Sequence, residues 1–108
     1  MLTVLTLVAL FGFTPVVTLN TRVPAGTTHT AFAITARAAA IVNYDDVTGA
    51  FQVCRHPQIA RGSWGRGSCW DLTVSPGWTS IEADGDQYGD LHVRFTHTTS
   101  GQTLIWTF

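Results

Sequence analysis

Hydrophobic and polar residues alternate along much of the chain with the two-residue period of a β-strand. The alternation is clear in five stretches, 16–23, 31–42, 50–55, 91–98 and 102–108. Successive side chains of a strand point to opposite faces, so this period places the apolar side chains of each stretch on one face. The pattern predicts strands that turn one face toward a core. The run of alanines at 36–40 also fits a helix, and periodicity alone does not decide between the two.

Short clusters of turn-forming residues separate these stretches. They lie at 24–26, 43–49, 75–77, 84–89 and 100–101. Their residue types favour turns because glycine adopts positive φ, proline fixes φ, and short polar side chains bond to the backbone. The cluster at 99–101 should close a hairpin between 91–98 and 102–108. Roughly seven short strands at this spacing predict an all-β fold, an antiparallel β-sandwich or small barrel.

The composition agrees with this fold and argues against several functions. Seventeen of the 108 residues are threonine, a β-branched residue that suits a pleated, half-buried surface. The chain has no lysine and a formal net charge of −1, which argues against a dedicated nucleic-acid-binding protein. It contains no linker, internal repeat, or nucleotide- or metal-binding motif. We therefore expect a single β domain over 1–108 and no cofactor.

The N-terminal segment carries no charged side chain before Arg22 and is apolar over 2–13. Three interpretations fit it. A β-strand agrees with the residue types and with apolar residues on both alternating faces. A secretory signal should have a basic residue before the apolar run and a small-residue cleavage motif after it, and both are missing. A membrane anchor needs about 18–20 apolar residues, whereas Pro15 interrupts this run.

We adopt the strand, within 1–15, as the working interpretation. An uncharged strand with two apolar faces is an aggregation site unless protein covers it. The segment is therefore expected to serve as an arm that pairs with a protein partner, and an export segment is the alternative. The expected assembly contacts are its large apolar residues Val4, Leu7, Leu10, Phe11 and Phe13.

Cys54 and Cys69 are the only cysteines. Two thiols alone cannot supply the four ligands of a structural zinc site. An even cysteine count in a small β protein indicates a disulfide and therefore an oxidising, extracytoplasmic compartment. Two buried free thiols are the alternative. A bridge over this spacing contributes about 3 kcal/mol in the chain-entropy description.

The loop between the cysteines is rich in glycine and holds three of the six arginines. Long loops without their own secondary structure tend to be functional, and arginine and tryptophan are enriched where binding energy concentrates. One interpretation is a disulfide-closed binding loop for an anionic or aromatic-rich partner, with contacts from Arg55, Arg61, Trp64 and Arg66. The other is a solvated β-hairpin whose Trp64 and Trp70 fold back onto the core.

An acidic turn provides a weak calcium candidate. Asp84, Asp86 and Asp90 stand at alternate positions where oxygen ligands suit Ca²⁺. The segment lacks the distal glutamate and the flanking helices of an EF-hand. Because aspartate and glycine are also the residues of an ordinary β-turn, we expect a turn and no metal.

A charged strand face provides a candidate for catalysis. Across the acidic turn, Glu82 is expected to face His92 or Arg94. A glutamate, an arginine and a histidine on one face match, in residue type only, the base, phosphate-binding cation and acid of small secreted ribonucleases. Opposed charges on neighbouring strands are also common as surface ion pairs. No nucleophile-plus-base motif accompanies them, so we expect no catalytic residues.

These patterns suggest three functions. The favoured one is a non-enzymatic structural or assembly protein, such as a small subunit of a virus particle or surface filament, that binds a protein partner or itself through β-strands. The second is a secreted, disulfide-closed binding module or inhibitor that uses the loop from Cys54 to Cys69. The third is a small secreted phosphodiesterase or ribonuclease-like hydrolase that uses Glu82, Arg94 and a histidine. All three place the protein outside the cytoplasm, on a particle surface or secreted.

Overall fold

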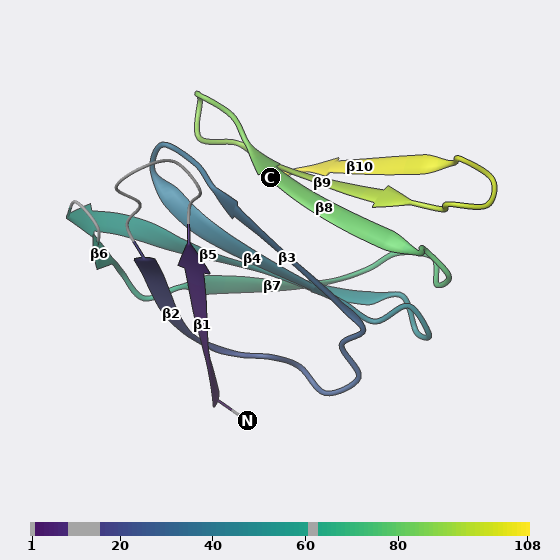
Figure 1. Ribbon diagram of the computed structural model, residues 1–108, viewed down its shortest axis with the longest axis horizontal. Coiled ribbons are helices and arrows are strands. Elements are labelled where there is room, and N and C mark those ends of the chain that lie inside the picture. Colours follow the sequence, from purple (N-terminus) through teal and green to yellow (C-terminus); the bar gives the residue numbers. More distant parts are fainter. Residues whose placement is uncertain (1, 9–15, 61–62) are drawn as a thin grey trace.

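The computed structural model describes residues 2–8, 16–60 and 63–108. Within these residues it contains ten strands and no helix (Figure 1). The strands are β1 (Leu2–Val8), β2 (Val16–Arg22), β3 (His29–Ile34), β4 (Ala38–Tyr44), β5 (Ala50–Ala60), β6 (Ser63–Trp64), β7 (Ser68–Thr73), β8 (Ser80–Gly85), β9 (Leu91–Thr96) and β10 (Thr103–Thr107). All pairing among them is antiparallel. The expectation of an all-β antiparallel fold with one disulfide is confirmed.

The strands form three sheets. β8, β9 and β10 make a three-stranded sheet with β9 in the middle, and β3 to β7 make a five-stranded sheet in which β5 pairs with β4, β6 and β7. The two curve around a shared core as a half-barrel and meet where β3 lies beside β8 (Figure 1). At this junction Gly85 lies so close to Thr35 that a Cβ on it would approach the Thr35 methyl carbon to 2.5 Å.

The core lies between the inner faces of these two sheets. Phe95 on β9 is fully buried, and its ring packs edge-on against Tyr44 and Phe51 with both centroid distances at 5.2 Å. Alternate residues of three strands enter the core as the sequence pattern predicts, namely Phe51, Val53, Leu91, Val93, Phe95, Leu104 and Trp106. Complete burial of each such side chain contributes about 1.5–3 kcal/mol, so this cluster dominates the stability of the fold.

The stretch 31–42, expected as one strand, is two strands joined by a tight turn. The Thr35 hydroxyl accepts hydrogen bonds from the backbone N–H groups of Arg37 and Ala38, and the Thr35 N–H donates to the Ala38 carbonyl at 2.8 Å. The hydroxyl thus takes the place of the glycine or proline that usually marks a turn. The chain reverses at once, and the alanines expected as strand or helix begin β4, which is buried along its whole length.

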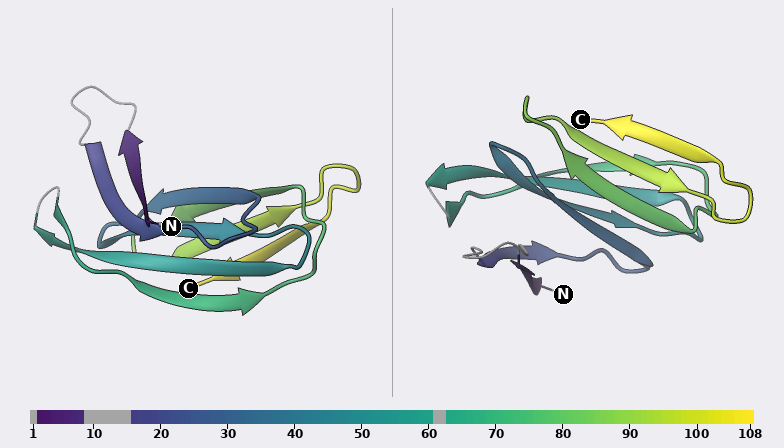
Figure 2. Two further views of the ribbon diagram at one scale, coloured as in Figure 1. Left: turned by 90° about the horizontal axis from the view of Figure 1, so that it is seen from below. Right: turned by 45° about the horizontal axis from the view of Figure 1, so that its top comes forward.

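The first two strands form a sheet of their own, which we call the N-terminal hairpin. Its register pairs Leu2 with Arg22 and Val8 with Val16, without a bulge. Figure 2 shows the hairpin on the side of the five-stranded sheet that faces away from the three-stranded sheet. The outer face of the five-stranded sheet has its own apolar cluster there, in which Phe32 and Trp64 pack against the buried Ala39 and Ile41.

Candidate functional site

Apolar residues stand opposite one another in the register of the N-terminal hairpin. Leu5 pairs with Leu19 and Leu7 with Val17. The alternate pairs are Leu2 with Arg22, Val4 with Asn20, Thr6 with Thr18, and Val8 with Val16. Among the described residues, neither strand is hydrogen-bonded to another sheet. Both outer edges of the hairpin therefore offer unpaired backbone groups.

The structure confirms strand conformation for part of the expected N-terminal arm. Of the five expected assembly residues, Val4 and Leu7 lie in β1, on opposite faces of the hairpin. Leu10, Phe11 and Phe13 lie outside the described residues. β1 pairs with β2 of its own chain, a partner that the sequence pattern did not suggest. The pairing of this arm with another protein stays a prediction.

The segment between the cysteines is a β-hairpin and not the irregular loop that one interpretation expected. β5 continues past Cys54 to Ala60, and the chain returns through β6 and β7 so that Cys69 stands directly opposite Cys54. The predicted disulfide joins this opposed pair, with a Cα–Cα distance of 4.1 Å. The bridge therefore closes the base of a hairpin that extends the five-stranded sheet, and we call 54–69 the disulfide hairpin.

The expected binding residues of the disulfide hairpin do not share one surface. The Arg55 guanidinium donates a hydrogen bond to the carbonyl of Gly89, in the turn between β8 and β9. Trp64 is half-buried against the outer-face cluster of the five-stranded sheet. Arg66 is exposed, and Arg61 lies outside the described residues. Of the two tryptophans expected to cover the core, Trp64 folds back and Trp70 remains 45% exposed.

A histidine that the sequence did not single out organises the disulfide hairpin. His56 is 7% exposed, and its Nδ1 lies 3.2 Å from the carbonyl oxygen of Gly65. Its ring lies on Gly67, where a Cβ would come within 2.6 Å of the ring. Gly65 and Gly67 therefore permit close packing of the His56 imidazole against the backbone. The sequence signal for this packing was the presence of these two glycines shortly after His56.

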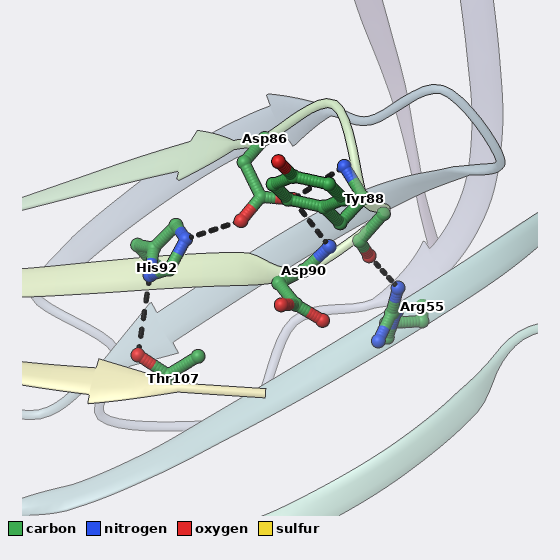
Figure 3. A network of polar contacts seen from close by, with 7 residues as sticks. Arg55, Asp86, Tyr88, Asp90, His92 and Thr107 are labelled. Carbon is green, nitrogen blue, oxygen red and sulfur yellow. Dashed lines mark hydrogen bonds and ion pairs between the residues drawn. The ribbon is translucent and has the colours of Figure 1, made fainter.

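A polar network joins the β8–β9 turn to β10 (Figure 3). His92 lies at its centre, with Nε2 2.9 Å from an Asp86 carboxylate oxygen and Nδ1 3.1 Å from the Thr107 hydroxyl. The other Asp86 oxygen accepts hydrogen bonds from the backbone N–H groups of Tyr88 and Asp90. Because an ionised carboxylate only accepts, Nε2 carries the proton, and a neutral ring then accepts from Thr107.

The network lowers the pKa of the Asp86 carboxyl. The hydrogen bond from His92 is the largest cause of the lowered pKa. Desolvation is the next in size and opposes it, and the backbone N–H groups of Asp90 and Tyr88 add to the lowering. A carboxylate held by three donors is the usual cap of a tight turn. Within the described residues, no group of three His, Cys, Asp or Glu side chains, the weak calcium candidates Asp84, Asp86 and Asp90 included, is placed to hold a metal ion.

The charged strand face is arranged as the sequence predicted. Glu82 stands directly opposite Arg94, with 3.8 Å between the carboxylate and guanidinium groups, and Asp84 stands opposite His92. These four side chains and Ile105 border a hollow on the outer face of the three-stranded sheet. Both members of the Glu82–Arg94 pair are more than half exposed, so their attraction is worth a fraction of a kcal/mol, about 0.2–1.

The charge of this hollow disfavours a phosphodiester substrate. Two carboxylates, those of Glu82 and Asp84, line it with one guanidinium and one imidazole, and a third carboxylate, Asp86, is bonded to that imidazole. An anionic ligand would be repelled by more groups than attract it. The imidazole is also engaged on both nitrogens. The juxtaposition that a hydrolase would need is present, but the electrostatics favour an ion-pair surface.

A second hollow, of about 90 Å³, lies where the segment between β2 and β3 passes the five-stranded sheet. It is lined in part by Pro24, Asn43, Gln52 and Asp71. Asn43 is 2% exposed, and its amide nitrogen has no hydrogen-bond partner among the described residues, although its oxygen accepts from Thr30 at 2.8 Å. The register of the sheet places four polar residues opposite one another across β3, β4, β5 and β7, namely Thr30, Asn43, Gln52 and Asp71. The sequence carried no signal of this polar row, because it depends on the pairing of strands and not on any local pattern.

The part of the chain that the structure describes contains no helix with the length and apolarity to cross a bilayer. No family model matches the chain, and no curated protein or solved structure matches it.

Proposed function

We propose that this protein is a non-enzymatic assembly protein, a small subunit of a virus particle or surface filament, that associates through its N-terminal hairpin. One observation carries the proposal. Among the described residues β1 and β2 pair only with each other, and Arg22 is the only residue in 1–22 with a charged side chain. The backbone groups along both edges of the hairpin remain for a neighbour.

The physical basis is that such a hairpin is incomplete by itself. Two strands alone are marginally stable in water, because they bury little apolar surface against each other. Each leucine or valine that a partner buries completely contributes about 1.5–3 kcal/mol to association before ordering costs. Edge strands are normally protected by a charge, a proline or a bulge, and none of these occurs within β1. Strand addition would supply main-chain hydrogen bonds together with this burial.

The other two functions have less support. A binding module built on the disulfide hairpin would lack Arg55 and Trp64, which bond to and pack against the same chain. A phosphodiesterase would place its substrate against the carboxylates of Glu82 and Asp84. The Cys54–Cys69 disulfide is compatible with the proposed location on a particle or outside the cell, where oxidising conditions preserve such bonds.

The test is the mass of the full chain in solution, measured by sedimentation over a range of concentrations. We expect oligomers whose average mass grows with concentration. Leu7→Glu and Val4→Glu, one on each face of the hairpin, should each weaken association at least about tenfold. A carboxylate buried without a partner costs more than the roughly 1.4 kcal/mol that a factor of ten represents.

Val47→Glu is the matched control. Val47 is 77% exposed in the turn between β4 and β5, so this variant adds the same charge to the same residue type away from the hairpin. It should associate like the parent protein. A parent chain that is monomeric at every concentration would refute the proposal, and an equal loss in Val47→Glu would assign the effect to net charge.

A further inference from the structure

The free edge of β10 is an unprotected strand edge. Phe108 and Leu91 exchange both backbone hydrogen bonds, at 2.8 and 2.9 Å, and such pairs alternate along an antiparallel ladder. Leu104 and Trp106 therefore bond to β9, whereas the backbone N–H and C=O groups of Thr103, Ile105 and Thr107 point away from it. Among the described residues no strand pairs with this side of β10.

The other outer strands of the two large sheets are better protected. β6 has only two residues, and β7 carries Asp71. β8 carries Glu82 and Asp84, and β3 and β8 lie beside each other. β10 has the sequence TLIWT, with no charge and no proline, and its pairing with β9 has no bulge. Charges, proline and bulges are the features that keep strand edges from pairing with other chains. β10 is therefore the edge in this body most open to strand addition.

Apolar side chains accompany this edge. Trp106 and Phe108 stack at a centroid distance of 6.1 Å and remain only partly buried where they pack on Phe51. On the outer face of the same strand, Ile105 is 58% exposed. A strand placed beside β10 would therefore meet apolar groups on both faces. It would need apolar residues at alternate positions on both of its own faces.

We propose that β10 accepts the N-terminal hairpin of a second copy of this chain, added through β1. The inference rests on the proposed function and specifies the surface that the hairpin binds. β1 has the required pattern, LTVLTLV, with leucine, valine and threonine alone and no charge. The hairpin of the same chain lies beyond the five-stranded sheet, on the side away from the three-stranded sheet that contains β10 (Figure 2). A second copy is the occupant that brings an identical uncharged strand to this edge.

The arrangement joins two different surfaces, the hairpin of one copy and β10 of the next. A single head-to-tail contact leaves the β10 edge of one copy and the hairpin of the other free. It continues to a ring or an open filament, depending on the rotation between neighbours. Each added copy would extend the three-stranded sheet by the two strands of the incoming hairpin.

The experiment separates the two surfaces by variants of the full chain. Ile105→Pro removes an N–H group that points to the free edge and leaves the bonds to β9 intact, and proline is tolerated at such edge positions. Ile105→Thr, which keeps that N–H, is the matched control, and Ile105→Lys provides a second edge variant should the proline disturb folding. Leu7→Glu serves as the hairpin-deficient chain. Circular dichroism checks that each variant is folded.

We expect Ile105→Pro and Leu7→Glu each to associate at least about tenfold more weakly than Ile105→Thr. Mixed in equal amounts, the two weakened chains should form a complex of two copies and no larger species, since one intact hairpin and one intact edge remain. If Ile105→Pro and Ile105→Lys assemble like the parent while Leu7→Glu does not, the hairpin binds elsewhere and the β10 inference is wrong. A mixture that stays monomeric also overturns it. A monomeric parent chain refutes the proposed function itself.

Discussion

The chain has two hairpins that extend beyond its core, and they are stabilised by different means. The disulfide hairpin continues a strand of the five-stranded sheet, is closed at its base by Cys54–Cys69, and lays Trp64 on its own sheet. The N-terminal hairpin forms a separate two-stranded sheet with no covalent closure among its described residues. The first is completed by contacts within the chain. The second pairs with no other strand among the described residues.

The two hairpins also differ in the number of charged residues in their sequences. The disulfide hairpin contains three arginines, whereas the N-terminal hairpin has no charged side chain before Arg22. Charge on an exposed hairpin keeps it solvated and discourages pairing with other chains. The disulfide hairpin therefore carries charges that oppose pairing with other chains, and the sequence of the N-terminal hairpin before Arg22 carries none. This difference is why we assign assembly to the N-terminal hairpin.

The largest effect that would sharpen this comparison is removal of the disulfide. The double change Cys54→Ser and Cys69→Ser opens a bridge with a sequence separation of 15, which should lower the free energy of unfolding by about 3 kcal/mol. The measurement is chemical unfolding followed by tryptophan fluorescence. Association through the N-terminal hairpin should not change at concentrations where the variant stays folded. A fall in association equal to that in Leu7→Glu would contradict the independence of the two hairpins.

Local pattern was enough to predict much of the fold. The hairpin of β9 and β10 follows from strict alternation and a Ser100-Gly101 turn, and Gly101 does adopt a positive φ of 73°. The division of 31–42 was missed because Thr35 closes that turn with its hydroxyl, and the segment has no glycine or proline to mark it. Hydroxyl-closed turns depend on geometry that residue type does not specify.

The candidate site was predictable only where one turn fixes the register. Glu82 faces Arg94 because β8 and β9 are joined directly, so their spacing in sequence determines their pairing. The contact of Arg55 with Gly89 spans 34 positions and depends on how the two sheets close around the core. The packing of Trp64 on the cluster of Ala39 and Ile41 likewise depends on a hairpin that folds back over its own sheet. Neither contact has a local signal.

An intermediate effect is expected from the tryptophan that secures the disulfide hairpin. Trp64→Ala removes a half-buried indole from the outer-face cluster and should lower the free energy of unfolding by about 2 kcal/mol, less than the roughly 3–5 kcal/mol of a fully buried aromatic residue. Arg66→Ala, an exposed neighbour, should change it by less than about 0.5 kcal/mol. Equal unfolding midpoints for the two variants would show that the hairpin does not depend on this packing.

The smallest expected effect concerns the turn on which the disulfide hairpin rests. Arg55, in the base of that hairpin, bonds to Gly89, and Asp86 holds the same turn through the N–H groups of Tyr88 and Asp90. The hydrogen bond from His92 lowers the pKa of Asp86 below its ordinary value of 3.8. Folding therefore favours the ionised carboxylate. Its contribution to stability is complete above pH 3.8 and is lost as the pH falls through the lowered pKa.

Asp86→Asn should accordingly lower the thermal unfolding midpoint slightly at pH 7, because the amide carries less charge for its three donors. The difference from the parent should shrink as the parent carboxylate is protonated below pH 3.8. Asp90→Asn is the matched control, since Asp90 joins the turn through its backbone N–H, which the substitution keeps. A deficit in Asp86→Asn that stays constant from pH 7 to the acid limit would mean that shape, and not charge, makes Asp86 hold the turn. The turn that accepts the hydrogen bond from Arg55 would then be held equally well at every pH in this range.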